Sequence, residues 1–106
     1  MPKYLVHGSY TVEGVKGLVK DGGTGRVDAV KRLAESVGGK VESMYFAFGN
    51  DDFYVVVDLP DAESAVAVAA TVVSSGAANV RTTVLVTAEQ VDAAMRKTVT
   101  YRRPGS

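Results

Sequence analysis

The feature that most constrains this chain is a pair of apolar segments separated by four turn-forming residues. Residues 41–48 and 53–59 are rich in aromatic and β-branched side chains, which favour β-strands. Between them lie residues 49–52, Gly-Asn-Asp-Asp, a composition that forms turns readily. The two segments therefore predict an antiparallel β-hairpin.

A strand and an interrupted helix are expected before the hairpin. Residues 4–10 carry aromatic and β-branched side chains and predict a first strand. Thr11 can cap a following helix, since its side chain can accept hydrogen bonds from free backbone N–H groups. Residues 21–23, Asp-Gly-Gly, interrupt the helical spacing, and Gly38-Gly39 end it.

A helix, a strand and a short helix are expected after the hairpin. Pro60-Asp61 opens an alanine- and valine-rich helix that runs to about Ser75. Residues 80–86 predict the fourth strand. Thr87 and Gln90 have the spacing of a capping box, which predicts a short final helix to about Lys97.

The order of these elements, β-α-β-β-α-β, is that of the ferredoxin-like fold. It predicts an α+β protein with a four-stranded antiparallel sheet, helices on one face of that sheet and a short C-terminal helix. The chain has 106 residues, which suits one domain. We expect this domain to span residues 1–97 and to be followed by a flexible tail at 98–106.

The second face of the sheet is apolar as well. Along residues 53–59, Phe53, Val55, Val57 and Leu59 alternate with Tyr54, Val56 and Asp58. Because successive side chains of a strand point to opposite faces, neither face is fully polar. An apolar sheet face without a helix over it predicts self-association, sheet against sheet, as a homodimer or larger homo-oligomer.

Composition excludes several classes of function. The chain has no cysteine, so thiol catalysis and thiolate metal sites are excluded. Twelve basic residues balance twelve acidic ones, which gives no attraction to nucleic acids or anionic membranes. No apolar segment is long enough to cross a bilayer and no signal peptide is evident, so a cytoplasmic location is expected.

The sequence resembles the GYD-domain family of small bacterial and archaeal proteins from Met1 to about Met95. The segments that carry the resemblance are Pro2-Lys3-Tyr4-Leu5-Val6, Gly8-Ser9-Tyr10-Thr11, Glu13-Gly14-Val15-Lys16-Gly17, Gly39-Lys40-Val41-Glu42-Ser43, Tyr45-Phe46-Ala47-Phe48-Gly49 and Val55-Val56-Val57-Asp58-Leu59-Pro60-Asp61. The family takes its name from a Gly-Tyr-Asp signature near the hairpin. This chain has Gly-Asn-Asp-Asp at 49–52, so the tyrosine of the signature is missing.

The resemblance implies a ferredoxin-like domain similar to dimeric α+β barrels, in which two sheets pack face to face. It implies no particular reaction. Related barrels include cofactor-independent monooxygenases, haem-handling enzymes, isomerases and stress proteins, and an analogy at the level of the fold assigns none of these activities.

His7 is the strongest candidate for a catalytic residue. It is the only histidine, and imidazole is the usual acid or base near neutral pH. Within the first strand it could approach Tyr54 or Tyr45, and Tyr54 is the second candidate. The alternative is a partly buried histidine satisfied by a hydrogen bond, and the sequence shows no carboxylate placed to orient it.

Aromatic residues gather around the hairpin, namely Tyr45, Phe46, Phe48, Phe53 and Tyr54. Tyr45, Phe46, Phe48 and Tyr54 could form the wall of a pocket for a flat apolar ligand. The alternative is that these side chains fill the core and the seam of a dimer.

No cofactor or metal is expected from the sequence. We expect Asp51 and Asp52 to cap their own turn rather than bind a metal ion. A haem could take His7 as an axial ligand, but a single histidine in a strand gives little support. Residues 22–26, Gly-Gly-Thr-Gly-Arg, lack the ending of a phosphate-binding loop and indicate a hinge.

Two functions agree with these observations. The first is a self-associating protein that binds a small apolar molecule or serves a structural role, without catalysis. The second is a cofactor-independent enzyme, similar to monooxygenases or isomerases, that acts on an apolar or aromatic substrate between two sheets. Whether the protein is an enzyme is left open at this point.

Overall fold

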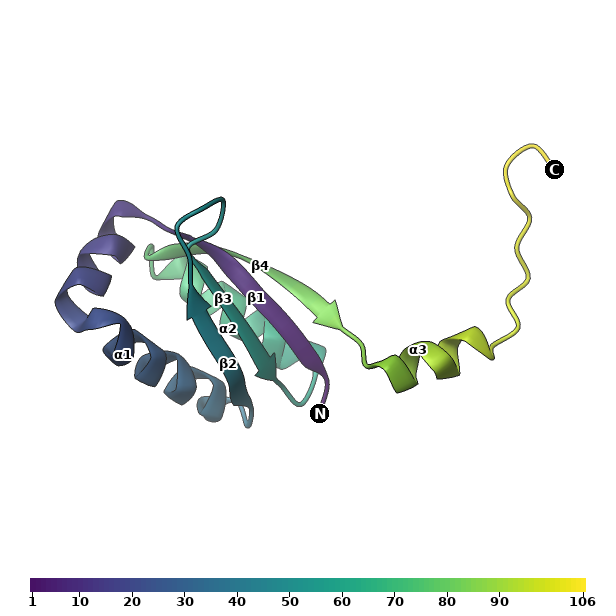
Figure 1. Cartoon of the computed structure of the whole chain (residues 1–106), viewed down its shortest axis with the longest axis horizontal. Helices are drawn as coiled ribbons and strands as arrows, with labels where there is room; N and C mark the ends of the chain where they lie inside the picture. The colour runs from purple at the N-terminus through teal and green to yellow at the C-terminus, as the bar shows by residue number, and fades with distance from the viewer.

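The computed structural model describes all residues from Met1 to Ser106. Four strands and three helices follow one another along the chain (Figure 1). They are β1 (Lys3–Tyr10), α1 (Val12–Ser36), β2 (Lys40–Phe46), β3 (Phe53–Asp58), α2 (Ala62–Ser74), β4 (Ala78–Leu85) and α3 (Ala88–Met95). The predicted order of elements is confirmed.

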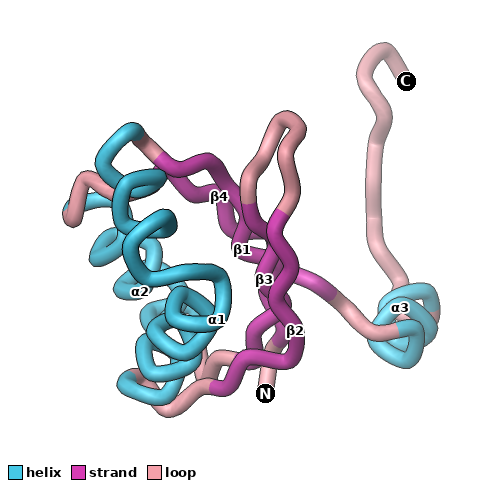
Figure 2. The backbone as a smooth tube through the Cα atoms, turned by 60° about the vertical axis from the view of Figure 1, so that its left-hand side comes forward, coloured by secondary structure: helices cyan, strands magenta, loops and turns pink.

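The four strands form one antiparallel sheet in the order β2-β3-β1-β4. Helices α1 and α2 both lie on one face of this sheet, and the opposite face is open (Figure 2). We call the face without helices the outer face. The arrangement confirms the predicted ferredoxin-like α+β fold with its helices on one side.

The helix boundaries have local causes in the sequence. The Thr11 side chain accepts a hydrogen bond from the Gly14 backbone N–H, and Asp61 accepts one in the same way from Ser64. At Gly22 the backbone has a φ of 75°, which interrupts α1 with a kink. The interruption predicted from the glycines is therefore confirmed.

The middle of the hairpin differs from the prediction. Strand β2 ends at Phe46 rather than at residue 48, after an irregularity in its pairing with β3 between Val41 and Ser43. Ala47 instead donates its backbone N–H to the Asp52 carbonyl at 2.8 Å and closes a longer loop. Phe48 consequently lies in this loop and not in the sheet.

The hydrophobic core lies between the sheet and the two helices. Its central side chain is Leu59, which is fully buried. Phe53, Val55 and Val57 of β3 are buried around it, and Tyr4 of β1 joins them. This inward-facing set is the one that the alternation of residues 53–59 predicts.

The C-terminal part of the chain extends away from the body of the domain. Figure 1 shows α3 and the following tail projecting beyond the end of β4, and no residue of α3 is buried. The radius of gyration is 16.9 Å, whereas a compact domain of this size has about 13 Å. No helix in the structure is both long and apolar enough to cross a lipid bilayer.

Candidate functional site

A row of polar and aromatic side chains crosses all four strands on the outer face. In the register of the sheet, Tyr45 of β2 lies opposite Tyr54 of β3, Tyr54 lies opposite His7 of β1, and His7 lies opposite Arg81 of β4. The rings of His7 and Tyr54 are stacked, with centroids 5.8 Å apart and planes inclined by only 3°. The structure therefore brings the two residues predicted as catalytic into direct contact.

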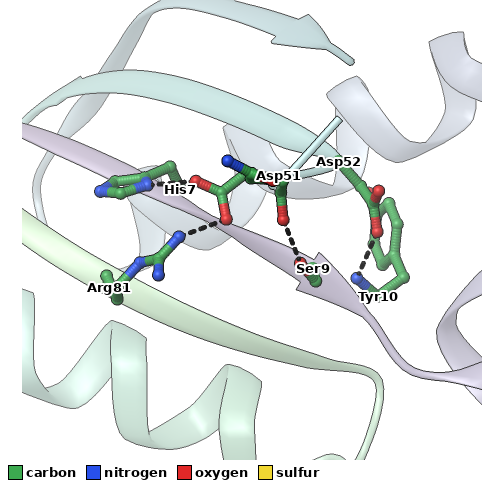
Figure 3. Close-up of polar contacts among 7 residues, drawn as sticks. His7, Ser9, Tyr10, Asp51, Asp52 and Arg81 are labelled. Carbon is green, nitrogen blue, oxygen red and sulfur yellow. Dashed lines mark hydrogen bonds and ion pairs between the residues drawn. The ribbon is translucent and has the colours of Figure 1, made fainter. Parts of the chain in front are cut away.

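The carboxylate of Asp51 holds the imidazole of His7 in place. The His7 Nδ1 atom lies 2.7 Å from Asp51 Oδ2, and the other carboxylate oxygen accepts a hydrogen bond from Arg81 (Figure 3). The Asp51 side chain is only 7% exposed, and that of His7 is 17% exposed. A buried carboxylate is thus paired with two potential cations, as buried charges require.

These neighbours favour the ionised form of Asp51. The hydrogen bond from His7 lowers the pKa of the Asp51 carboxyl, and the Arg81 guanidinium lowers it further, against a smaller opposing effect of burial. Because the carboxylate can only accept hydrogen bonds, the Nδ1 atom of His7 must carry the hydrogen. In the neutral imidazole the Nε2 atom is then the unprotonated one, and it can accept a proton.

The hairpin loop is fastened to β1, and this attachment places Asp51. The Asp52 backbone N–H donates to the Gly8 carbonyl at 2.7 Å, and the Asp52 side chain accepts from the Tyr10 backbone N–H at 2.9 Å. The Ser9 hydroxyl donates to the Asn50 carbonyl at 3.1 Å (Figure 3). The prediction that Asp51 and Asp52 cap their own turn is therefore wrong, because the loop folds back onto β1 and their side chains bond to residues outside the turn.

The remaining predicted ligand-binding residues do not meet His7. Tyr45 shares the row on the outer face but is 71% exposed. Phe46 lies opposite Phe53 and packs against the core on the helical side of the sheet. Phe48 is 96% exposed in the loop. The aromatic residues around the hairpin are thus divided among two faces and a loop, and within one chain they enclose no common space.

Sequence reasoning missed Asp51 and Arg81 as partners of His7. Asp51 is 44 positions from His7 along the chain, and the contact depends on how the loop folds back. Arg81 lies in the predicted fourth strand, but its place beside His7 depends on the pairing of β4 with β1 in the sheet. Elsewhere in the structure, no group of three or more His, Asp or Glu side chains could hold a metal ion.

Two hollows lie near the sheet, one on each side. A polar hollow of about 150 Å³ lies beside Asp51 and Arg81. Its lining also includes Ser9, Asn50 and Asn79, but neither His7 nor a tyrosine. On the other side, a cavity of about 220 Å³ lies between the sheet and the helices, and 16 of its 19 lining residues are hydrophobic. We call this second space the interlayer cavity.

The positions of the helices explain the interlayer cavity. Helix α1 packs mainly against β2, and α2 packs against β4, which are the two edge strands of the sheet. The central strands β1 and β3 therefore lie below the gap between the helices. Val6 of β1 and Val55 of β3 line the floor of the cavity, while Val30 of α1 and Val72 of α2 line its walls.

The ionisation of Asp51 predicts a particular dependence of stability on pH. Because the folded-state pKa lies below the ordinary 3.8, the carboxylate stabilises the fold fully above about pH 4, and this contribution is lost as the pH falls through the folded-state pKa. We expect Asp51→Asn to reduce the free energy of unfolding near pH 7 and to reduce its decline on acidification. Urea unfolding across about pH 2–7 measures both.

The control for this experiment is Asp92→Asn, which changes an exposed acid of α3. Asp61, whose pKa is lowered by its hydrogen bond to Ser64, is present in both variants and contributes the same decline to each. If Asp51→Asn lost stability on acidification as steeply as the unmodified protein, the pairing of Asp51 with His7 and Arg81 would not contribute to the pH dependence of stability.

The fold and the contacts among His7, Asp51 and Arg81 define a small ferredoxin-like α+β domain with a carboxylate-oriented histidine. The family model of the GYD domain matches residues 4–95, and the chain belongs to the GYD-domain family. Comparisons with curated proteins and with solved structures gave no match.

Proposed function

We propose that this GYD-domain protein self-associates through its outer sheet face and binds a small apolar molecule in the interlayer cavity. The observation that carries the proposal is the cavity itself. A well-packed core leaves few spaces larger than a water molecule, whereas this one has about 220 Å³. An apolar cavity of about 150 Å³ already accommodates benzene. Filling the space with an apolar ligand would restore the dispersion contacts that its lining residues lack.

A neutral apolar probe tests the binding part of the proposal. We expect 2-phenylethanol to shift the amide resonances of cavity-lining residues, and Ala29→Leu to weaken its binding by about tenfold or more, because the larger side chain occupies the space. The measurement is an NMR titration of the labelled protein. Ala67→Leu is the matched control, since Ala67 is exposed on α2 and does not line the cavity.

Equal weakening by both substitutions, or the absence of any shift with 2-phenylethanol at millimolar concentration, would contradict binding in this cavity. Because Ala29 is half-buried in α1, circular dichroism of the Ala29→Leu variant establishes that the helix is retained.

The surface area of the chain supports self-association. A compact protein of 11.1 kDa exposes about 5,700 Å², whereas this chain exposes 7277 Å². Only 12 of its 106 residues are buried. The projecting α3 and tail contribute to this excess, and the whole of it is larger than the area of about 800 Å² that each partner buries in a standard interface. Sedimentation velocity measures the mass, and a monomer at every concentration would contradict this part of the proposal.

The contact between His7 and Asp51 favours a second candidate function, a cofactor-independent enzyme. A histidine oriented by a carboxylate is the arrangement in which imidazole acts as a general base. His7 Nε2 would accept a proton from an apolar substrate held between two sheets, and the stacked Tyr54 would orient that substrate. The space between sheets requires a second copy of the chain.

The ring opening of 5-nitrobenzisoxazole tests His7 as a base without knowledge of the substrate, because this reaction needs only the removal of one proton. We expect His7→Gln to lower the rate of the protein-dependent reaction about 100-fold, and Asp51→Asn to lower it less. Absorbance of the phenolate product measures the rate. A rate unchanged in His7→Gln would leave the binding function as the only candidate.

A further inference from the structure

The interlayer cavity is apolar everywhere except at one end. Only three of its lining residues are not hydrophobic, and Arg26 is the only charged one among them. The other two, Thr71 and Ser75, belong to the last turn of α2 and its C-cap. No acidic side chain lines the cavity. The electrostatic character of the site is therefore set by one guanidinium, which favours an anion.

Arg26 is positioned by the kink in α1. Gly22 ends the first part of the helix, and Arg26 lies in the first turn of the part that follows. Its side chain is 32% exposed, so the guanidinium lies at the boundary between cavity and solvent. The nearest acid is Asp21, whose carboxylate is 3.6 Å from the Arg26 Nη1 atom. This separation is longer than a hydrogen bond. The contact with Asp21 therefore leaves N–H donors of the guanidinium available to a ligand.

Tyr10 adds a second donor at the same end. Its ring packs against Phe53 with centroids 5.0 Å apart, and it lines the cavity together with Arg26. Burial raises the pKa of the Tyr10 phenol, and the nearby Arg26 guanidinium opposes this effect only in part. Tyr10 therefore keeps its hydrogen at neutral pH and can donate it. The strand register places it beside Ala78, close to the end of α2.

We propose that the interlayer cavity binds a small organic acid, with its carboxylate held by Arg26 and Tyr10 and its apolar body among the valines and leucines. The acid carries one aromatic ring or a short alkyl chain, since the cavity of about 220 Å³ is larger than a cavity of about 150 Å³ that binds benzene, but smaller than two such cavities. The geometry suits a carboxylate because the planar guanidinium can donate two parallel hydrogen bonds to it. This inference rests on the proposed function in the same cavity.

Phenylacetate and 2-phenylethanol form a matched pair of probes, because they differ mainly in a carboxylate against a hydroxymethyl group. We expect the protein to bind phenylacetate about tenfold or more tightly than 2-phenylethanol in NMR titrations near pH 7. Arg26→Gln should abolish this preference by weakening the binding of phenylacetate far more than that of 2-phenylethanol. Arg26→Lys should retain part of it, and Tyr10→Phe should reduce it several-fold.

Arg32→Gln is the control, since Arg32 is exposed on the same helix as Arg26 and does not line the cavity. It should leave the preference unchanged, and circular dichroism verifies the fold of each variant. If both probes bound equally well, or if Arg26→Gln kept the preference, the assignment of an acid would be overturned while the cavity remained a binding site. If neither probe bound, both this inference and the proposed binding function would fail.

Discussion

Replacing Gly8 by alanine is expected to destabilise the domain strongly, because the backbone of the neighbouring strand β4 fills the space beside this glycine. A Cβ atom at this position would lie 1.9 Å from the Asn79 carbonyl oxygen and 2.9 Å from the Val80 Cα atom. Both belong to the backbone of β4, which cannot move aside as a flexible side chain can. The strands β1 and β4 would have to separate at this point, although they pair from Lys3 to Tyr10.

We expect Gly8→Ala to lower the free energy of unfolding by about 3 kcal/mol or more, a large part of the about 5–15 kcal/mol typical of a folded protein. Urea unfolding followed by circular dichroism measures this loss. Gly17→Ala is the matched control, because no atom lies within 4 Å of a Cβ at that position in α1. It should stabilise the protein by up to about 1 kcal/mol. Similar midpoints for both variants would contradict the close approach of the two strands.

Replacing Val56 by glutamate is expected to abolish self-association. Val56 lies on the outer face, with Leu5 opposite it on β1 and Ser43 opposite it on β2. In a symmetric dimer each substitution is present twice in the same interface. Two carboxylates would then be desolvated without partners, which costs several kcal/mol. We expect the dissociation constant to rise about 100-fold or more, which corresponds to about 2.7 kcal/mol.

Sedimentation velocity over a range of concentrations measures this change. Val84→Glu is the control, since Val84 is 64% exposed and lies opposite Tyr4, whose side chain faces the helices. Both substitutions place glutamate in a strand, so they share the cost of its lower strand propensity. If association persisted in Val56→Glu but were lost in Val84→Glu, the interface would lie on the helical side of the sheet, and the proposed outer-face interface would be contradicted.

The fold was predictable because its signals are local. The alternation in residues 53–59, the caps at Thr11 and Asp61 and the interruption near Gly22 each depend on a few neighbouring residues. Every predicted strand is present, with ends within two residues of the observed ones. The end of β2 was missed because residues 47 and 48 belong to the hairpin loop, whose course is set by its bonds to the distant strand β1.

The candidate site was only partly predictable. His7 and Tyr54 were identified because their residue types suit proton transfer, and the pairing of β1 with β3 places them side by side. The contribution of Asp51 required the loop to fold back on β1, a contact across 44 positions that no local pattern indicates. The interlayer cavity was not anticipated, because it depends on the distance between two helices that the sequence does not specify. The expected space between two sheets needs a second copy and stays a prediction.

The way the hairpin loop is fastened has a consequence for folding kinetics. Its bonds join residues 30 to 44 positions apart, from Asp51 to Arg81 and to His7. Such distant residues meet only after β1, β3 and β4 have come together, because closing long loops costs entropy before any contact repays it. Contacts that form after the transition state change the rate of unfolding and not the rate of folding. We therefore expect the contact between His7 and Asp51 to form late in folding, so that it slows unfolding of the native state without accelerating folding.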